Sequence, residues 1–278
     1  MTKVIARSTV TRAVTQKQVR HVMESFRSGG VALIQGASRG LGLGFCDKLL
    51  ASGRFSRVYA TGRHAGKSQG LAEMQQCYGD ALVPVPMDIS SEDDIRVAAE
   101  RIGSQDSRLD LLMNVSGVLH DADRGMRPEK RLEDIDFAHL EHSFRVNAFG
   151  SILIAKYFHR FLSHEDKAVF ASLSARVGSI EDNGLGGWYS YRAAKAAQNQ
   201  FSRTAAIELG RRAKHVIVLS LHPGTTDTGL SEPFQERVPE GRLFSVDFVT
   251  DRLLGIIDNA DTNDSGRFFA WDGQPIPW

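Results

Sequence analysis

From residue 31 onward, short apolar runs alternate with longer segments whose apolar residues recur at helical spacing. The short runs predict strands over Val31–Gln35, Arg57–Thr61, Leu82–Pro86, Leu109–Asn114, Val169–Leu173, Val216–Leu221 and Arg267–Ala270. The longer segments predict helices over Leu41–Ser52, Lys67–Tyr78, Ser91–Ile102, Phe137–Phe161, Tyr189–Arg211 and Val246–Asp258. This alternation predicts an α/β fold, with a single doubly wound Rossmann-type parallel sheet of about seven strands and helices on both faces.

Two prolines place the third predicted strand within that sheet. Pro84 and Pro86 lack the N–H group, and because they are two residues apart, both missing donors point to the same side. An edge strand tolerates this loss, since one of its sides has no partner. In the doubly wound order 3-2-1-4-5-6 the third strand lies at the edge. The prolines therefore favour this order.

The composition is that of an ordinary globular protein. Apolar residues make up 42% of the 278 residues, charged residues make up 24%, and the formal net charge is +1. Without a basic stripe nothing indicates a nucleic-acid partner, and no apolar run approaches the length of a membrane span. Cys46 and Cys77 make neither a disulfide framework nor a zinc cluster, which favours a reducing compartment. His139 and His142 lack further ligands, so we expect a solvated helix face and no metal site.

Residues 1–28 are expected to form an N-terminal extension to one domain over residues 29–278. Their only acid is Glu24, whereas their basic residues are Lys3, Arg7, Arg12, Lys17, Arg20 and Arg27. Such a start can be an organelle transit peptide. Alternatively, a short amphipathic helix docks on the domain through Val19, Val22, Met23 and Phe26. We expect a cytoplasmic location, or the mitochondrion or plastid if the extension is a transit peptide.

Two polar loops, His120–Glu133 and Glu232–Arg242, would follow strands on the carboxyl side of the sheet. Open α/β folds bind their ligands at this edge. The loops either shape a substrate pocket or are plain surface insertions.

A glycine-rich segment, Gly36-Ala37-Ser38-Arg39-Gly40-Leu41-Gly42, joins the first predicted strand to the first helix. Glycines let the backbone turn tightly and approach a pyrophosphate closely. The helix N-terminus then offers free N–H groups and the positive end of its dipole. The segment therefore predicts a dinucleotide site, although its glycine spacing differs from the general G-x-G-x-x-G pattern. We assign cofactor contacts to Gly36, Ser38, Arg39, Gly40, Leu41 and Gly42.

The residues after the second strand indicate which dinucleotide is preferred. Sites that select NAD place an acid there to bind the ribose hydroxyls, but the segment from Tyr59 to Arg63 contains none. Arg63 and Arg39 instead supply two guanidinium groups, which suit a 2′-phosphate. The sequence therefore favours NADP(H).

Tyr191 and Lys195 are four residues apart in a predicted helix and so share one face. Tyrosine titrates near 10 in water and is a reluctant acid or base at neutral pH. An ammonium at ~4 Å and an effective dielectric of ~20 attracts the phenolate by ~4 kcal/mol, before desolvation offsets it. We therefore expect Lys195 to lower the pKa of Tyr191 toward the range of general acid/base catalysis.

These motifs resemble those of the short-chain dehydrogenase/reductase family. Gln35 stands where the family usually has threonine, and Val115 and Ser116 depart from its Asn-Asn-Ala-Gly segment. The resemblance implies catalysis by Asn147, Ser174, Tyr191 and Lys195, with Asn147 holding a water linked to Lys195. It also implies cofactor contacts from Asp88, Ile89, Asn114, Ser116, Gly117, Tyr191, Lys195, Pro223, Gly224, Thr226 and Thr228. Ser172 is the less favoured alternative to Ser174, and Asp88 and Thr228 could instead be helix caps.

Segments 174–180, 186–195, 221–225 and 266–273 are similar to those of the C-factor and sniffer-like branch of the family. This resemblance implies an NADPH-dependent oxidoreductase that reduces the carbonyl group of a small-molecule aldehyde or ketone. The alternative is an NADP(H)-binding signalling or sensor module with little turnover. A dehydratase or epimerase on the same scaffold would leave the cofactor unchanged overall. Homodimers and homotetramers are the candidate assemblies, with neither nucleic acid nor membrane as a partner.

Overall fold

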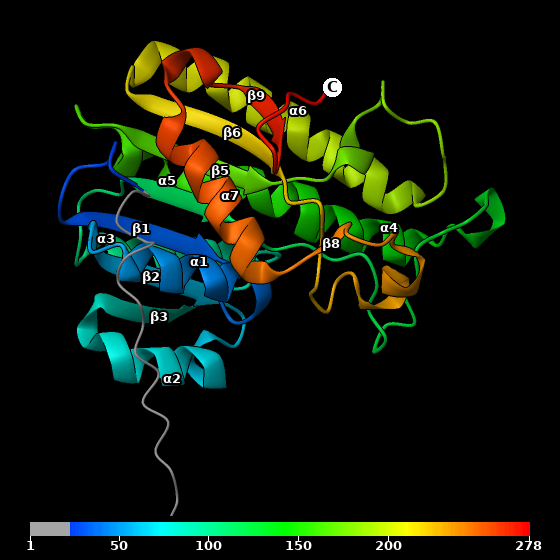
Figure 1. Cartoon of the computed structure of the whole chain (residues 1–278), viewed down its shortest axis with the longest axis horizontal. Coiled ribbons are helices and arrows are strands. Elements are labelled where there is room, and N and C mark those ends of the chain that lie inside the picture. The colour runs from blue at the N-terminus through cyan, green and yellow to red at the C-terminus, as the bar shows by residue number, and fades with distance from the viewer. Residues whose placement is uncertain (1–22) are drawn as a thin grey trace, which may run out of the picture.

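The computed structural model describes residues 23–278 and contains one large parallel sheet (Figure 1). Its strand order is β3-β2-β1-β4-β5-β6-β9, and every neighbouring pair is parallel. The strands are β1 (Gly30–Gln35), β2 (Phe55–Gly62), β3 (Leu82–Pro86), β4 (Leu111–Asn114), β5 (Ala168–Leu173), β6 (Val216–His222) and β9 (Arg267–Ala270). The expected doubly wound sheet is confirmed, and β3 with its two prolines lies at the edge.

Helices cover both faces of this sheet. On one face pack α1 (Gly40–Ala51), α2 (Gln69–Tyr78) and α7 (Val246–Asn259). On the other face pack α3 (Glu92–Gly103), α5 (Gly150–Leu162) and α6 (Tyr189–Arg212). Strand β1 serves both cores, because alternate side chains of a strand point to opposite faces: Ile34 belongs to the first core and Leu33 to the second.

The helix expected over residues 137–161 is continuous but contains one irregular turn. It consists of α4 (Phe137–Phe144), the π-helical turn η4 (Arg145–Phe149) and α5. A π turn inserts one residue into the helical repeat, and such turns occur frequently at functional sites. This one contains Asn147.

The longest connections between elements lie at the carboxyl ends of the strands, after β4, β5 and β6 (Figure 1). Both predicted polar loops lie here, and the second includes the short 3₁₀ helix η6 (Glu232–Arg237). A small parallel pair, β7 (Thr225–Thr226) and β8 (Leu243–Phe244), closes that loop and was not predicted. The remaining short helical turns are η1 (Ala65–Lys67), η2 (Gly79–Ala81), η3 (Leu132–Asp134), η5 (Arg176–Gly178) and η7 (Thr262–Asp264).

The end of the expected N-terminal extension packs on the domain. Met23 and Phe26 are buried in the core beneath α1 and α7, as the amphipathic interpretation requires, although they lie in a turn and not in a helix. The backbone N–H groups of Met23, Glu24 and Ser25 donate to the Asp258 carboxylate at the end of α7. Val19, Val22 and the proposed targeting segment lie outside the described residues, apart from residues 23–28.

Within residues 23–278, no helix combines the length and the apolar character needed to cross a membrane.

Candidate active site

The glycine segment forms a tight turn between β1 and α1. A methyl group at Gly42 would lie 2.1 Å from the carbonyl oxygen of Gly36, and one at Gly36 would lie 2.7 Å from Ser116 Oγ. The N-cap residue of α1, Arg39, makes no side-chain capping bond, and the first turn contains no acid. The first N–H groups of a helix need acceptors, and here neither a cap nor an acid supplies them. The turn therefore fits the phosphates of a dinucleotide.

The glycine turn packs against the end of β2, next to Arg39 and Arg63 in the chain. A methyl group at Gly62 would lie 2.8 Å from Ser38 Oγ, so the residues adjoining the two arginines are in contact. Both arginines are exposed, and neither guanidinium forms an ion pair or hydrogen bond within residues 23–278. Two such guanidinium groups beside the glycine turn are suited to bind a phosphate.

Segments from β4 and β6 approach the same turn. The Thr228 side chain would lie 3.3 Å from a methyl group built on Gly40. Ser116, which follows β4, lies next to Gly36. Thr228 is not a helix cap, since Ser231 precedes η6. Thr226 is buried, and its carbonyl accepts from Ser231 Oγ at 2.5 Å. Gly224 has a φ of +71° and a methyl group there would strike Phe244, so the Pro223–Gly224 turn requires glycine.

Three other expected cofactor residues differ in whether they have partners within residues 23–278. Asp88 does not cap α3, because Ser91 is its N-cap, and the Asp88 carboxylate accepts from the N–H and hydroxyl of Ser90. Ile89 is buried against Gly150. Asn114 at the end of β4 is buried, and neither Nδ2 nor Oδ1 of its side chain has a hydrogen-bond partner in the described structure.

Tyr191 and Lys195 lie on the buried face of α6, which packs on β6 and η5. That face is polar along its length, because Gln198, Asn199 and Ser202 continue it. The Nζ atom of Lys195 donates to the carbonyl oxygen of Leu173 and to Gln198 Oε1, both at 2.8 Å. It lies 5.8 Å from the centroid of the Tyr191 ring.

Asn147, Gly117 and Lys195 meet at the carboxyl end of β4. From a methyl group built on Gly117, Asn147 Oδ1 would be 3.2 Å away and Lys195 Nζ 3.7 Å away. The Asn147 side chain holds the backbone of Val118, accepting from its N–H at 3.0 Å and donating to its carbonyl oxygen at 2.7 Å. The π turn, the β4 loop and α6 therefore converge on one point.

Burial shifts both central ionisable groups toward their neutral forms. The pKa of Tyr191 is raised by desolvation. The pKa of Lys195 is lowered by desolvation to about 7. The expectation that Lys195 would lower the pKa of Tyr191 is therefore wrong for this arrangement, because burial of the phenol outweighs an ammonium bound to other acceptors.

The structure separates the two candidate serines. Ser172 lies within β5, where its hydroxyl contacts Ser151 Oγ of α5 at 3.2 Å. Ser174 follows β5, and its hydroxyl donates to Asn199 Oδ1 of α6 at 2.6 Å. Ser174 is thus the serine that contacts the polar face of α6, the face that also carries Tyr191. Its hydroxyl group is engaged as a donor to Asn199.

Sequence reasoning missed several residues that surround Tyr191. Gln198 and Asn199 occupy the same helix face as Lys195, and that spacing was visible in the sequence. Glu129 is buried at the start of α6, where its carboxylate accepts from the hydroxyl and N–H of Ser190. Trp188 packs with its ring edge toward Tyr191, with centroids 6.3 Å apart. No sequence periodicity reveals these last two contacts.

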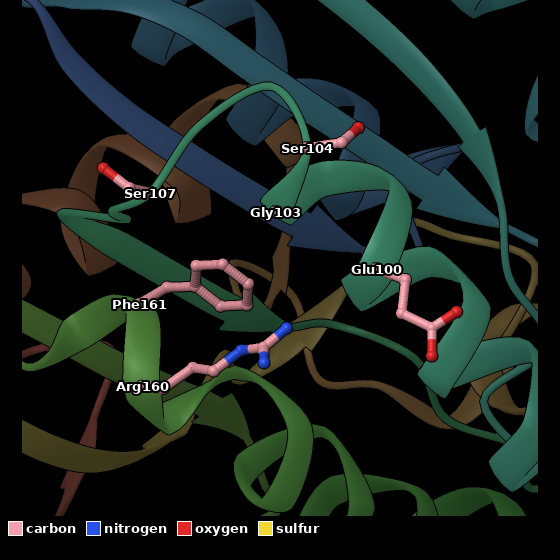
Figure 2. Close-up of a pocket in the computed structure, with 6 residues that line it drawn as sticks. All are labelled: Glu100, Gly103, Ser104, Ser107, Arg160 and Phe161. Carbon is pink, nitrogen blue, oxygen red and sulfur yellow. The ribbon is translucent and has the colours of Figure 1, made fainter.

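An open hollow of about 490 Å³ lies near the amino ends of the strands, whereas the glycine turn and Tyr191 lie at their carboxyl ends (Figure 2). Glu100 of α3, Arg160 and Phe161 of α5, and Ser104 and Ser107 of the loop before β4 line it. It lies beside the amino end of β4, away from Tyr191. Within residues 23–278, no group of three or more His, Cys, Asp or Glu side chains is arranged to hold a metal ion.

Comparison with known proteins places this arrangement in a family. The family model for short chain dehydrogenases matches residues 30–239. C-signal of Myxococcus xanthus is 31% identical over 147 residues, which are 53% of this chain and 83% of that protein. The NADPH-bound carbonyl reductase from chicken fatty liver is 28% identical, with a TM-score of 0.79 over 91% of this chain and 100% of that chain. Carbonyl reductase Sniffer of D. melanogaster shares the fold at 22% identity, with a TM-score of 0.78 over 91% and 100% of the two chains.

These similarities confirm the expected resemblance to the C-factor and sniffer-like branch. The glycine turn, the Tyr191–Lys195 face of α6 and the match over residues 30–239 lead to one assignment. The chain belongs to the short chain dehydrogenase family and is an oxidoreductase similar to carbonyl reductases.

Proposed function

We propose that this protein reduces a carbonyl group of a small molecule with NADPH. One observation carries the proposal: Lys195 and Asn147 meet at Gly117, beside Tyr191, at the sheet edge where the glycine turn also lies. A buried phenol and a buried amine on one helix face have a clear chemical use beside a dinucleotide. The resemblance to an NADPH-bound carbonyl reductase supports the same activity.

The proposed cofactor site extends from the glycine turn to α6. Arg39 and Arg63 would hold the 2′-phosphate, and the N-terminus of α1 would hold the pyrophosphate. Lys195 would bind the nicotinamide ribose. The complete proposed set is Gly36, Ser38, Arg39, Gly40, Leu41, Gly42, Arg63, Asp88, Ile89, Asn114, Ser116, Gly117, Tyr191, Lys195, Pro223, Gly224, Thr226 and Thr228.

When bound, NADPH supplies a hydride to the carbonyl carbon. Tyr191 gives the proton to the carbonyl oxygen, so the carbonyl becomes an alcohol and Tyr191 recovers its proton from solvent. The raised pKa of Tyr191 keeps it protonated before the reaction. Lys195 stabilises the phenolate that forms, and Ser174 turns from Asn199 to orient the carbonyl oxygen. Asn147 holds the Val118 backbone in place. Its position beside Lys195 suits a water that would link Lys195 to solvent.

A sensor with little turnover is the second candidate, and one observation favours it. Lys195 Nζ donates to the carbonyl oxygen of Leu173 and to Gln198 Oε1, and within residues 23–278 no hydrogen bond joins it to the Tyr191 hydroxyl. Such a protein would bind NADPH tightly and report its presence without consuming it. The intact Tyr191–Lys195 pair favours the enzyme.

The test is a panel of aldehydes, ketones and quinones, assayed by loss of NADPH absorbance and repeated with NADH. Tyr191→Phe should reduce turnover by at least about 100-fold while leaving NADPH affinity largely unchanged. Tyr189→Phe is the matched control, because Tyr189 is exposed on the same helix. Retained turnover in Tyr191→Phe refutes the assignment. Tight NADPH binding without turnover across the panel favours the sensor.

A further inference from the structure

Three aromatic rings form a row that ends at Tyr191. The rings of Trp188 and Tyr191 meet edge to face, with centroids 6.3 Å apart and planes at 72°. Phe234 packs against Trp188 with centroids 5.1 Å apart, and His120 packs against Phe234 at 6.3 Å. We call Trp188, Phe234 and His120 the aromatic wall. None of its three members is a predicted site residue, and the proposed chemistry does not use them.

The aromatic wall is assembled from three separate loops at the carboxyl edge of the sheet. His120 follows β4, Trp188 precedes α6, and Phe234 lies in η6. His120 also bridges two of these loops, because its Nε2 contacts the carbonyl oxygen of Gly229 at 3.0 Å. Trp188, Phe234 and His120 are all half-buried, so part of each ring remains open to a ligand.

Trp188 is held in a backbone conformation that bulky residues seldom adopt. Its φ is +53° and its ψ is +44°, which is the left-handed region. The Trp188 N–H donates to the carbonyl oxygen of Glu129 at 2.6 Å. The Glu129 carboxylate in turn accepts from Ser190, so two positions on either side of Tyr189 are fixed to one residue. Strain that the surroundings enforce in this way is concentrated at functional sites.

We propose that Trp188 and Phe234 determine substrate specificity by favouring flat, conjugated carbonyl compounds. This inference rests on the proposed function and names its substrate class. Ring faces bind a planar π-system through stacking in addition to buried area, whereas a puckered saturated ring gains only the area. Glu129, the charged neighbour of Trp188, is buried and its carboxylate is engaged with Ser190, so this charge is not exposed beside the rings of Trp188 and Phe234.

The experiment compares acetophenone with cyclohexyl methyl ketone, which share one carbon skeleton and differ in the flatness of the ring. The measured quantity is the ratio of kcat/KM for the flat ketone to kcat/KM for the saturated one. Trp188→Leu and Phe234→Leu should each lower this ratio by about tenfold, the effect of losing one aromatic contact. Tyr189→Leu, the adjoining exposed aromatic residue outside the wall, should leave the ratio unchanged.

Trp188→Gly separates binding from folding. Glycine adopts the left-handed conformation without strain, which offsets part of the packing lost with the indole ring. This variant should therefore still fold and show one cooperative thermal transition. Its specificity ratio should nevertheless fall as in Trp188→Leu. Equal loss on both ketones, or a wild-type ratio close to one, overturns the inference.

A binding measurement keeps this result independent of turnover. Calorimetric titration of NADP⁺-saturated protein gives the Kd of each ketone. Tighter binding of acetophenone that is lost in Trp188→Gly supports the inference even if neither ketone is reduced, and only the proposed function then fails. Equal affinity for both ketones, or binding of neither, overturns the inference.

Discussion

The Nζ atom of Lys195 lies 5.8 Å from the centroid of the Tyr191 ring and donates to the carbonyl oxygen of Leu173 at 2.8 Å. The ammonium is therefore held by the end of β5 and not by the phenol. Burial then dominates the titration of both groups: it raises the pKa of Tyr191 and lowers that of Lys195 to about 7. As a result Lys195, and not Tyr191, changes its charge near neutral pH.

The first prediction concerns the pH dependence of carbonyl reduction. The cationic fraction of Lys195 falls as pH rises through about 7, whereas the raised pKa of Tyr191 leaves the phenol protonated there. Negative charge develops on the Tyr191 oxygen as it gives its proton to the substrate, and the Lys195 cation stabilises that charge. We expect kcat/KM to be level below pH 7 and to fall about tenfold per pH unit above it. Initial rates across this range, at saturating NADPH, provide the measurement.

Gln198→Leu provides the control for that profile. Gln198 Oε1 accepts a hydrogen bond from the ammonium at 2.8 Å, which favours its charged form. Without this acceptor the pKa of Lys195 falls further, and the decline of kcat/KM should begin at lower pH. A decline at the same pH in both proteins would show that another group controls the profile.

The second prediction concerns the choice of cofactor. Arg39→Ala and Arg63→Ala each remove an exposed guanidinium, near the glycine turn, that has no partner within residues 23–278. A hydrogen bond to a charged group is worth enough to weaken NADPH binding by about 10- to 100-fold when it is lost. The Kd of NADH, which lacks the 2′-phosphate, should change little. Arg101→Ala, at an exposed arginine of α3, is the control. Parallel weakening of both cofactors would contradict the assignment of these arginines.

Much of the fold was predictable because short apolar runs alternate regularly along the chain with segments of helical periodicity. The predicted strands over Leu82–Pro86 and Arg267–Ala270 match β3 and β9 in full, and the order of the sheet followed from alternation and two prolines. The π turn at Arg145–Phe149 was missed, because a shift of one hydrogen-bond partner leaves no pattern in the apolar positions. The β7–β8 pair was missed because two residues cannot establish a period.

The candidate site was predictable where chemistry follows spacing within one element. The Tyr191–Lys195 face was inferred from a separation of four residues. The contacts of Glu129 with Ser190 could not be inferred, since 61 residues separate them and their meeting depends on how a loop folds back. The electrostatic expectation failed for the same reason, because burial and the competing acceptors of Lys195 are properties of the assembled fold.

The third prediction follows from the burial of Glu129. Its carboxylate accepts from the N–H and hydroxyl of Ser190, the residue preceding Tyr191. Glu129→Ala leaves these buried donors without an acceptor, and we expect unfolding to become easier by about 1–3 kcal/mol. Urea denaturation measures this loss. Glu129→Gln retains one acceptor oxygen and should lose less, whereas an equal loss in both variants would show that the charge itself is required.

The fourth prediction compares two helical glycines that differ in their surroundings. A methyl group at Gly42 would lie 2.1 Å from the Gly36 carbonyl oxygen and 2.9 Å from Ala37 Cα, which are backbone atoms that side-chain rotation cannot move. Gly42→Ala should therefore push the turn away from α1, cost about 1–3 kcal/mol of stability and abolish NADPH binding. In contrast, a methyl group at Gly255 of α7 meets no atom within 4 Å.

Gly255→Ala should stabilise the protein by about 0.5–1 kcal/mol, because alanine loses less backbone entropy in a helix. Both variants are measured by urea denaturation and by titration with NADPH. Gly42→Ala with normal affinity for NADPH would show that the turn does not contact the cofactor. Loss of affinity in Gly255→Ala as well would mean that binding responds to any change in the helices flanking the sheet, and the specific role of Gly42 would then have no support.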